Sequence, residues 1–124
     1  MNNSSGETLA AACREGDLKK VQDLMKQGVD VNYKTKQFKT PIYEALDNGH
    51  EEIVAELLKQ DKLDVNLGWT IKLQTPLHFC CENGKSKFVK MLLAHPKINK
   101  TLKNKDGKTP AELTKSNAIL KLLA

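Results

Sequence analysis

Cysteine and histidine are the residues of this 124-residue sequence whose chemistry is most easily turned to catalysis or metal binding. His78 precedes Cys80 by two positions, and an imidazole base beside a thiol is the pair that nucleophilic catalysis uses. Nucleophile and base must meet through tertiary geometry, however, and proximity in sequence does not supply that. None of the three histidines, His50, His78 and His95, has a metal-ligand spacing with a cysteine pair. We therefore expect no catalytic site, no metal site and no cofactor, and we expect that the protein is not an enzyme.

The cysteines also argue against a secreted, disulfide-linked protein. There are three of them, Cys13, Cys80 and Cys81, and an odd set with two adjacent members is a poor disulfide framework. Residues 1–7 are polar and lack the apolar run of a signal peptide. No stretch approaches the roughly 18 to 20 apolar residues that span a membrane. We expect reduced, mostly buried thiols in a soluble monomer without membrane contact, located in the cytoplasm or the nucleus.

The composition is that of a globular protein, with 40% hydrophobic, 28% charged and 5% aromatic residues. Charge is distributed unevenly along the chain. Residues 1–62 contain nine basic and eleven acidic residues, whereas residues 63–124 contain eleven lysines and four acidic residues. The basic half favours an acidic partner, although a solvated surface with no binding role is the commoner explanation of such an excess.

A repeated pattern organises the whole sequence. Three Thr-Pro dipeptides begin at Thr40, Thr75 and Thr109, at spacings of 35 and 34 residues. Gly49 and Gly84 each lie nine residues after the threonine that precedes them. Other elements return in the same register: the pairs Leu57-Leu58 and Leu92-Leu93, and the triplets Asp30-Val31-Asn32 and Asp64-Val65-Asn66. The sequence is therefore built from repeats of one structural unit.

Each unit is predicted to be two short helices followed by an extended loop. A threonine hydroxyl can accept a bond from a free backbone N–H at a helix start, and proline fits the first helical position. Thr109 and Glu112 add the spacing of a capping box. Glycine ends the first helix, and the second helix carries one apolar stripe, as in Ile53, Val54 and Leu57. The connecting segments are short and polar, and we call them the first finger (33–39), the second finger (67–74) and the third finger (102–108).

A single pair of helices cannot cover its own apolar stripe, but pairs stacked on one another bury a continuous core. The predicted fold class is therefore an all-α repeat, a solenoid of about four helix-turn-helix repeats with connecting finger loops. We place the repeats at about 7–39, 40–74 and 75–108, with a C-terminal cap at 109–124, in one domain over residues 1–124. The cap has only Ser116-Asn117 as a break before a brief helix at 118–123.

The motif around the second Thr-Pro dipeptide closely resembles the ankyrin repeat. It consists of Thr75-Pro76-Leu77-His78, Cys80-Cys81, Gly84 and Leu92-Leu93. A second copy comprises Thr40-Pro41-Ile42-Tyr43, Ala45, Gly49-His50, Ile53-Val54 and Leu57-Leu58. The resemblance implies an ankyrin-type solenoid, and in size the chain is similar to small stand-alone members of the family. It also implies that the cysteines occupy alanine positions, where a small buried residue suffices. The chain departs from the family at Phe38 and Leu73, which stand where the fingers usually have glycine.

The resemblance further implies protein binding, because ankyrin proteins use finger tips and the exposed ends of the first helices as a concave binding surface. The positions that match in the fingers are Lys36, Gln37, Lys39, Ile71, Lys72, Gln74, Lys105, Asp106 and Lys108. Those at the helix ends are Arg14, Glu15, Asp47, Asn48, Glu82 and Asn83. For any one of them, an ordinary solvated polar residue is an equally good interpretation.

Large apolar residues in the fingers are a separate indication of partner binding. Trp69 leads this group, which also includes Tyr33, Phe38, Ile71 and Leu73. Large rigid side chains gain contact area in interfaces at a low cost in entropy. Trp69 is therefore a candidate anchor for a partner, the alternative being that these side chains fold back between adjacent fingers.

Two functions remain for comparison. The leading one is a protein-binding adaptor or stoichiometric inhibitor, whose finger lysines face another protein with an acidic surface. Nucleic acid is a weaker candidate, because the sequence lacks a recognised reader module and has little aromatic content for stacking beyond Trp69. The alternative function is a targeting domain that belongs to a longer enzyme or effector protein.

Overall fold

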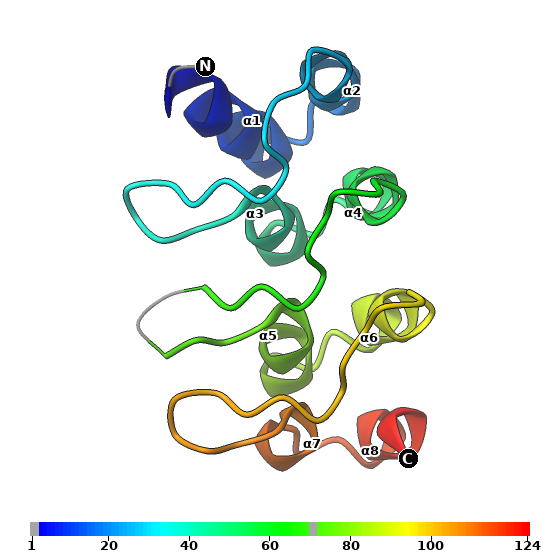
Figure 1. Ribbon diagram of the computed structural model, residues 1–124. Helices are drawn as coiled ribbons and strands as arrows, with labels where there is room; N and C mark the ends of the chain where they lie inside the picture. The colour runs from blue at the N-terminus through cyan, green and yellow to red at the C-terminus, as the bar shows by residue number, and fades with distance from the viewer. Residues whose placement is uncertain (1–2, 70–71) are drawn as a thin grey trace. The chain divides into compact units, whose positions relative to one another are not determined.

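Eight α-helices make up the part of the chain that the computed structural model describes, residues 3–69 and 72–124 (Figure 1). They are α1 (Asn3–Glu15), α2 (Leu18–Lys26), α3 (Pro41–Asp47), α4 (Glu51–Leu58), α5 (Pro76–Glu82), α6 (Ser86–Leu93), α7 (Pro110–Leu113) and α8 (Asn117–Leu123). Within these residues the only strand-like pairing is an isolated antiparallel bridge between Trp69 and Gln74. None of the helices in this part is both long and apolar enough to cross a lipid bilayer.

The helices follow one another as pairs, and three fingers connect successive pairs, which confirms the predicted all-α repeat. Residues 1–64 and 65–124 form two compact units. In the first unit α1 packs with α2, and α3 with α4; in the second unit α5 packs with α6, and α7 with α8. The first unit carries the first finger, and the second unit carries the second and third fingers.

Threonine before proline begins α3, α5 and α7, as the sequence predicts. The Thr40 hydroxyl oxygen accepts the backbone N–H three residues further on at 3.3 Å. Thr75 makes the same contact at the same distance with the backbone N–H of His78. Thr109 forms the predicted capping box, since its backbone N–H donates to the Glu112 carboxylate at 2.9 Å. Proline follows each threonine, where its missing N–H removes no hydrogen bond.

The core of the first unit lies between its four helices, where α1 packs against α3 and α2 against α4. Its fully covered side chains are Leu9, Ala12, Cys13, Val21, Ala45, Leu46, Ile53, Val54 and Leu57. Helix α1 begins at Asn3, four residues before the position at which we placed the start of the first repeat. The extra turn packs on the ring of Tyr33, which lies where a side chain at Gly6 would project.

In the second unit α5 packs against α7, and α6 against α8. Buried side chains here are Trp69, Leu77, Cys80, Cys81, Val89, Leu92 and Ile119. At the C-terminal end of this unit, α7 has four residues and a short α8 follows it. Ser116 starts α8 by accepting the backbone N–H of Ile119 on its hydroxyl oxygen at 3.2 Å.

All three cysteines are free and buried, as predicted. Burial raises the pKa of the Cys13 thiol to about 12 and that of Cys81 to about 11, and it also raises the pKa of Cys80. A thiol with a raised pKa stays protonated near neutral pH and is a poor nucleophile. These residues therefore act as small apolar side chains of the core.

Candidate partner-binding surface

His78, the base considered for a thiol-dependent reaction, is a structural residue of the second unit. Its Nδ1 accepts the backbone N–H of Thr75 at 3.2 Å, and its Nε2 donates to the carbonyl oxygen of Lys108 at 2.8 Å. The side chain is fully buried. Both ring nitrogens are therefore engaged, and neither is open to take a proton from Cys80. The imidazole ties the start of α5 to the end of the third finger.

Thr35 organises the first finger. Its backbone N–H donates to the carbonyl of Lys39 at 2.8 Å, and its carbonyl accepts the N–H of Phe38 at 2.9 Å. Its hydroxyl oxygen accepts the backbone N–H groups of Gln37 and Lys39 at 3.3 and 3.2 Å. Thr35 is itself buried, whereas Lys36, Gln37 and Phe38 are exposed. The backbone of the tip is thus held in place while its side chains face solvent.

Asn104 has the same role in the third finger. Its backbone N–H donates to the carbonyl of Lys108 at 2.9 Å, and its carbonyl accepts the N–H of Gly107 at 2.9 Å. Its side-chain oxygen accepts the backbone N–H groups of Asp106 and Lys108 at 2.9 and 3.0 Å. The first and third fingers therefore share one hydrogen-bonded turn, built once on a threonine hydroxyl and once on an asparagine amide.

The second finger is one residue longer, and backbone bonds of 2.8 and 3.2 Å between Trp69 and Gln74 close it. The indole of Trp69 is only 2% exposed and meets the Phe79 ring edge-on, with 5.9 Å between ring centroids. This burial corrects the choice of Trp69 as an anchor for a partner, because the ring fills the core of the second unit. The candidate Ile71 lies outside the described residues.

Hydrogen bonds join the second and third fingers to each other and to the end of α5. The backbone N–H of Lys105 donates to the carbonyl of Lys72 at 2.8 Å. The Asn104 side-chain amide donates to the Gln74 side-chain oxygen at 2.7 Å, and the Gln74 amide donates to the Glu82 carboxylate at 2.9 Å. Lys72, Glu82 and Lys105 are exposed, whereas Gln74 is half-buried. The second unit thus brings four of the predicted site residues together on one surface.

Residues predicted at the ends of the first helices are exposed, and two of them also have structural roles. Asn48 and Asn83 are the C-caps of α3 and α5, and each side-chain amide donates at 2.8 Å to the carbonyl four residues earlier. Both asparagines are exposed, as are Asp47 and Glu82. Each of these two helices therefore ends in an exposed carboxylate residue followed by an exposed asparagine.

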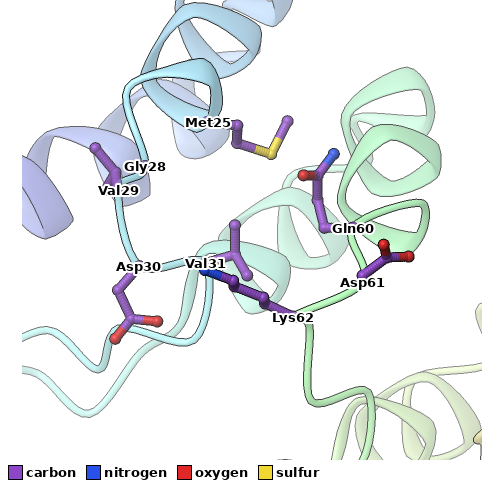
Figure 2. Close-up of a pocket in the computed structure, with 8 residues that line it drawn as sticks. All are labelled: Met25, Gly28, Val29, Asp30, Val31, Gln60, Asp61 and Lys62. Carbon is purple, nitrogen blue, oxygen red and sulfur yellow. The ribbon is translucent and has the colours of Figure 1, made fainter.

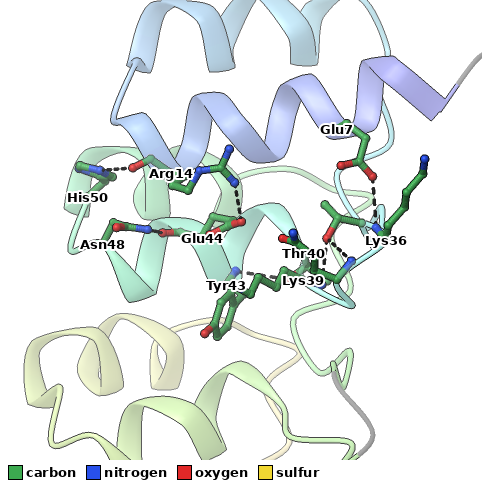
Figure 3. Close-up of polar contacts among 11 residues, drawn as sticks. Glu7, Arg14, Lys36, Lys39, Thr40, Tyr43, Glu44, Asn48 and His50 are labelled. Carbon is green, nitrogen blue, oxygen red and sulfur yellow. Dashed lines mark hydrogen bonds and ion pairs between the residues drawn. The ribbon is translucent and has the colours of Figure 1, made fainter.

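Figure 3 shows the polar contacts that fix the predicted residues of the first unit. Arg14 donates through Nη1 to the Glu44 carboxylate at 3.0 Å, and the Glu44 side chain is only 3% exposed. The carbonyl of Arg14 lies 2.9 Å from Nε2 of His50. The Lys39 ammonium lies 5.6 Å from the centroid of the Tyr43 ring. Sequence reasoning missed Glu44, although an acidic residue among the apolar residues Ile42, Ala45 and Leu46 of α3 was a sign of a buried partner.

The other apolar finger residues behave in two ways. Tyr33 folds back onto α1, where its hydroxyl donates to the Glu7 carboxylate at 3.2 Å. Burial, and then this contact with Glu7, raise the pKa of the Tyr33 phenol. The same carboxylate accepts the backbone N–H of Lys36 at 3.3 Å (Figure 3). Phe38 and Leu73 instead point outwards, with 56% and 54% of their surface exposed.

A pocket of about 460 Å³ lies in the first unit beside the ends of α2 and α4 (Figure 2). Its lining consists of Met25, Gly28, Val29, Asp30, Val31, Gln60, Asp61 and Lys62. Sequence reasoning missed this pocket, because two loops far apart in the chain form it. Its wall has apolar and charged parts but contains no nucleophilic thiol or hydroxyl. Within the described ranges, no group of three or more His, Cys, Asp and Glu side chains is arranged to hold a metal ion.

Comparison with known sequences gives a consistent result. A family model described as ankyrin repeats (three copies) matches residues 9–104. The chain is similar to Alpha-latrotoxin-Lg1a of Latrodectus geometricus, with 34% identity over 110 residues, which is 87% of this chain and 8% of that protein. It is also similar to Alpha-latrotoxin-Lt1a of Latrodectus tredecimguttatus, with 34% identity over 102 residues, which is 81% of this chain and 7% of that protein. The chain thus spans less than a tenth of the length of these curated relatives.

Proposed function

Because this chain belongs to the ankyrin-repeat family, we propose that it binds another protein through its fingers and helix ends, as an adaptor or a stoichiometric inhibitor. Ankyrin repeats are generally protein–protein interaction modules, and the family is typically non-enzymatic. The observation that carries the proposal is the construction of the fingers. Bonds to Thr35 and Asn104 fix two of the turns, while the side chains at their tips stay exposed. A rigid support of this kind lowers the entropy lost on binding.

We propose that the partner presents an acidic surface to the second unit. Residues 65–124 contain eleven lysines and three acidic residues. Lys72, Lys105 and Lys108 are all exposed, on two fingers that are hydrogen-bonded to each other. Opposite charges speed the encounter of two proteins, and salt screens this effect. We expect the association rate constant to fall steeply as salt is added, with a much smaller change in the dissociation rate constant.

Affinity capture followed by mass spectrometry tests the proposal and identifies the partner. The informative variants are Lys36→Glu and Lys105→Glu, which reverse a charge at a finger tip. Lys26→Glu and Lys90→Glu are matched controls, because they make the same change on exposed residues of α2 and α6. We expect a saturable partner that the finger variants lose and the controls keep. Equal loss in the controls, or no saturable partner of the unchanged chain, would contradict the proposal.

A second candidate function is the targeting domain of a longer enzyme or effector protein. It is supported by the length of the relatives, since the matched segments are 8% and 7% of the two latrotoxins. A targeting domain uses the same surface, but its effect is to bring another domain to the partner. The complete coding region distinguishes the two functions. A reading frame that continues into a further domain favours targeting, and a stop codon directly after residue 124 favours the adaptor.

We also propose that the protein is a monomer of the cytoplasm or the nucleus. The support for this location is the set of three free, buried cysteines, which fits a reducing compartment. Cell fractionation with an antibody to the native chain tests the location, and light scattering during size-exclusion chromatography tests the oligomeric state. Recovery from the secretory pathway, or a mass twice that of one chain, would contradict these proposals.

A further inference from the structure

Two finger tips contain an unusual backbone conformation. Phe38 has a φ of 63° and Leu73 a φ of 55°, and no other non-glycine residue of the described ranges has a positive φ. In this left-handed region the Cβ atom of an L-residue crowds the neighbouring carbonyl oxygen, and a bulky residue there is an outlier. Conformations of this kind persist where the surrounding structure fixes them, and they cluster at functional sites.

The turn itself does not need a large residue at this position. In the third finger Gly107 occupies it with a φ of 76°, and Asn104 makes the same four bonds that Thr35 makes in the first finger. Glycine enters the left-handed region without the steric strain that a Cβ atom causes. Folding of the turn therefore favours glycine at position 38, and the phenylalanine there needs another explanation.

The two side chains contribute little to the core. Phe38 is 56% exposed and Leu73 is 54% exposed, and the next most exposed large hydrophobic residue of the described part is Leu120, at 40%. Leu120 lies in the regular helix α8. The two residues with a strained backbone are therefore also the two large hydrophobic residues that are most open to solvent. The positive φ is a property of the backbone and the exposure is a property of the side chain, so these are two independent observations on the same residues.

We propose that Phe38 in the first unit and Leu73 in the second unit are anchors, each of which inserts into an apolar pocket with an acidic rim on a partner protein. This inference rests on the proposed function and names the residues that carry it. The charged residues next to each anchor are lysines, whose charge is positive, and for this reason we expect the rim of the partner's pocket to be acidic. Lys36 and Lys39 lie on either side of Phe38 in the first finger, and Lys72 directly precedes Leu73 in the second.

The construction of the first finger makes Phe38 an effective anchor. The bonds to Thr35 hold the tip in one conformation, so that insertion of the ring loses little conformational entropy. Large side chains that fill well-packed pockets carry most of the binding energy of many interfaces. A lipid surface fits these tips less well, because one apolar side chain per finger buries too little surface to hold a protein on a membrane.

The test uses the full chain and the protein that it captures from cell lysate, purified and titrated by biolayer interferometry. Phe38→Ala and Phe38→Gly remove the ring in the first unit, and Leu73→Ala and Leu73→Gly remove the side chain in the second. Leu120→Ala is the matched control, because Leu120 is an exposed large hydrophobic residue outside the fingers. We expect each finger variant to weaken binding by about tenfold or more, and the control to bind like the unchanged chain.

Thermal unfolding of the same variants separates binding from folding. Glycine relieves the left-handed strain that alanine retains, so Phe38→Gly should unfold at a higher temperature than Phe38→Ala, although both lose affinity. If all four finger variants bind with unchanged affinity, the proposal that Phe38 and Leu73 are anchors is wrong, while the proposed function still stands.

Two other outcomes overturn more than the anchors. If the unchanged chain captures no saturable partner, the proposed function fails and the anchors fail with it. Phosphatidylserine vesicles are a second probe, in a sedimentation assay. Vesicle binding that Phe38→Gly abolishes, without any captured protein, would assign the tips to a membrane and overturn the protein partner.

Discussion

Gly6 offers a test of how tightly the first finger is held against α1. A Cβ atom at this position would lie 2.3 Å from Cγ of Tyr33, and 2.5 and 2.6 Å from its two Cδ atoms. Carbon atoms do not approach this closely in a packed interior, so the ring would have to move. The Tyr33 hydroxyl also donates to Glu7 on the same helix at 3.2 Å. A displaced ring therefore weakens that hydrogen bond as well.

Two opposing effects decide the outcome of Gly6→Ala. Alanine is more favourable than glycine inside a helix by about 1 kcal/mol. Overpacking costs about 1–3 kcal/mol, and the weakened hydrogen bond to the Glu7 carboxylate acts in the same direction. The steric effect is the larger one. We expect Gly6→Ala to lower the free energy of unfolding by about 1–2 kcal/mol.

Urea denaturation followed by circular dichroism measures this change. The control is the same substitution in a Tyr33→Ala background, where the clash is gone and alanine should stabilise by about 1 kcal/mol. A second measurement uses the phenol, whose pKa is raised by burial and then by Glu7, so that Gly6→Ala should lower the midpoint of its absorbance titration. Higher stability of Gly6→Ala with Tyr33 in place would refute the reasoning, because the ring would then yield without cost.

At position 38 the glycine variant should be more stable than the alanine variant by about 0.5–1 kcal/mol. Chemical denaturation should show that Gly107→Ala lowers the free energy of unfolding by a similar amount. Nothing lies within 4 Å of the Cβ position at Gly107, so only the backbone strain changes. Arg14→Ala leaves the buried Glu44 carboxylate without its guanidinium, and we expect a loss of about 1–2 kcal/mol that shrinks in a Glu44→Gln background. The pKa of the Cys13 thiol is raised from 9.0 to about 12, so the unfolded chain releases this proton first. The contribution of the Cys13 thiol to stability should therefore be complete below pH 9 and decline as the pH rises towards 12. Over the same pH range, the free energy of unfolding of Cys13→Ala should decline less. The prediction of one domain requires a single cooperative transition in calorimetry, and two separate transitions would contradict it.

Local chemistry explains what could be predicted from the sequence. Thr109 and Glu112 form their capping box because the interacting atoms lie within three residues of each other, whatever the rest of the chain does. The same reasoning identified the helix starts at Thr40 and Thr75. The apolar stripes repeat in register with these starts, so the packed helix pairs could also be predicted.

Contacts between distant segments explain what could not be predicted. Trp69 is large and lies in a finger, but its burial depends on Phe79 in α5. Arg14 lies at the end of a first helix, yet its guanidinium binds Glu44, which comes from another repeat. The departure from glycine at Phe38 was visible in the sequence. Only the structure shows that this residue keeps the left-handed conformation of a glycine turn and that its ring stays exposed.

The central claim is that the finger tips touch a protein partner directly. Photo-crosslinking tests it most directly, with benzoylphenylalanine placed at position 38 of the full chain and, for comparison, at position 120. After irradiation in cell lysate we predict one crosslinked product of defined mass from position 38, which unlabelled protein competes away, and none from position 120. No product from position 38, or the same set of products from both positions, would contradict the claim.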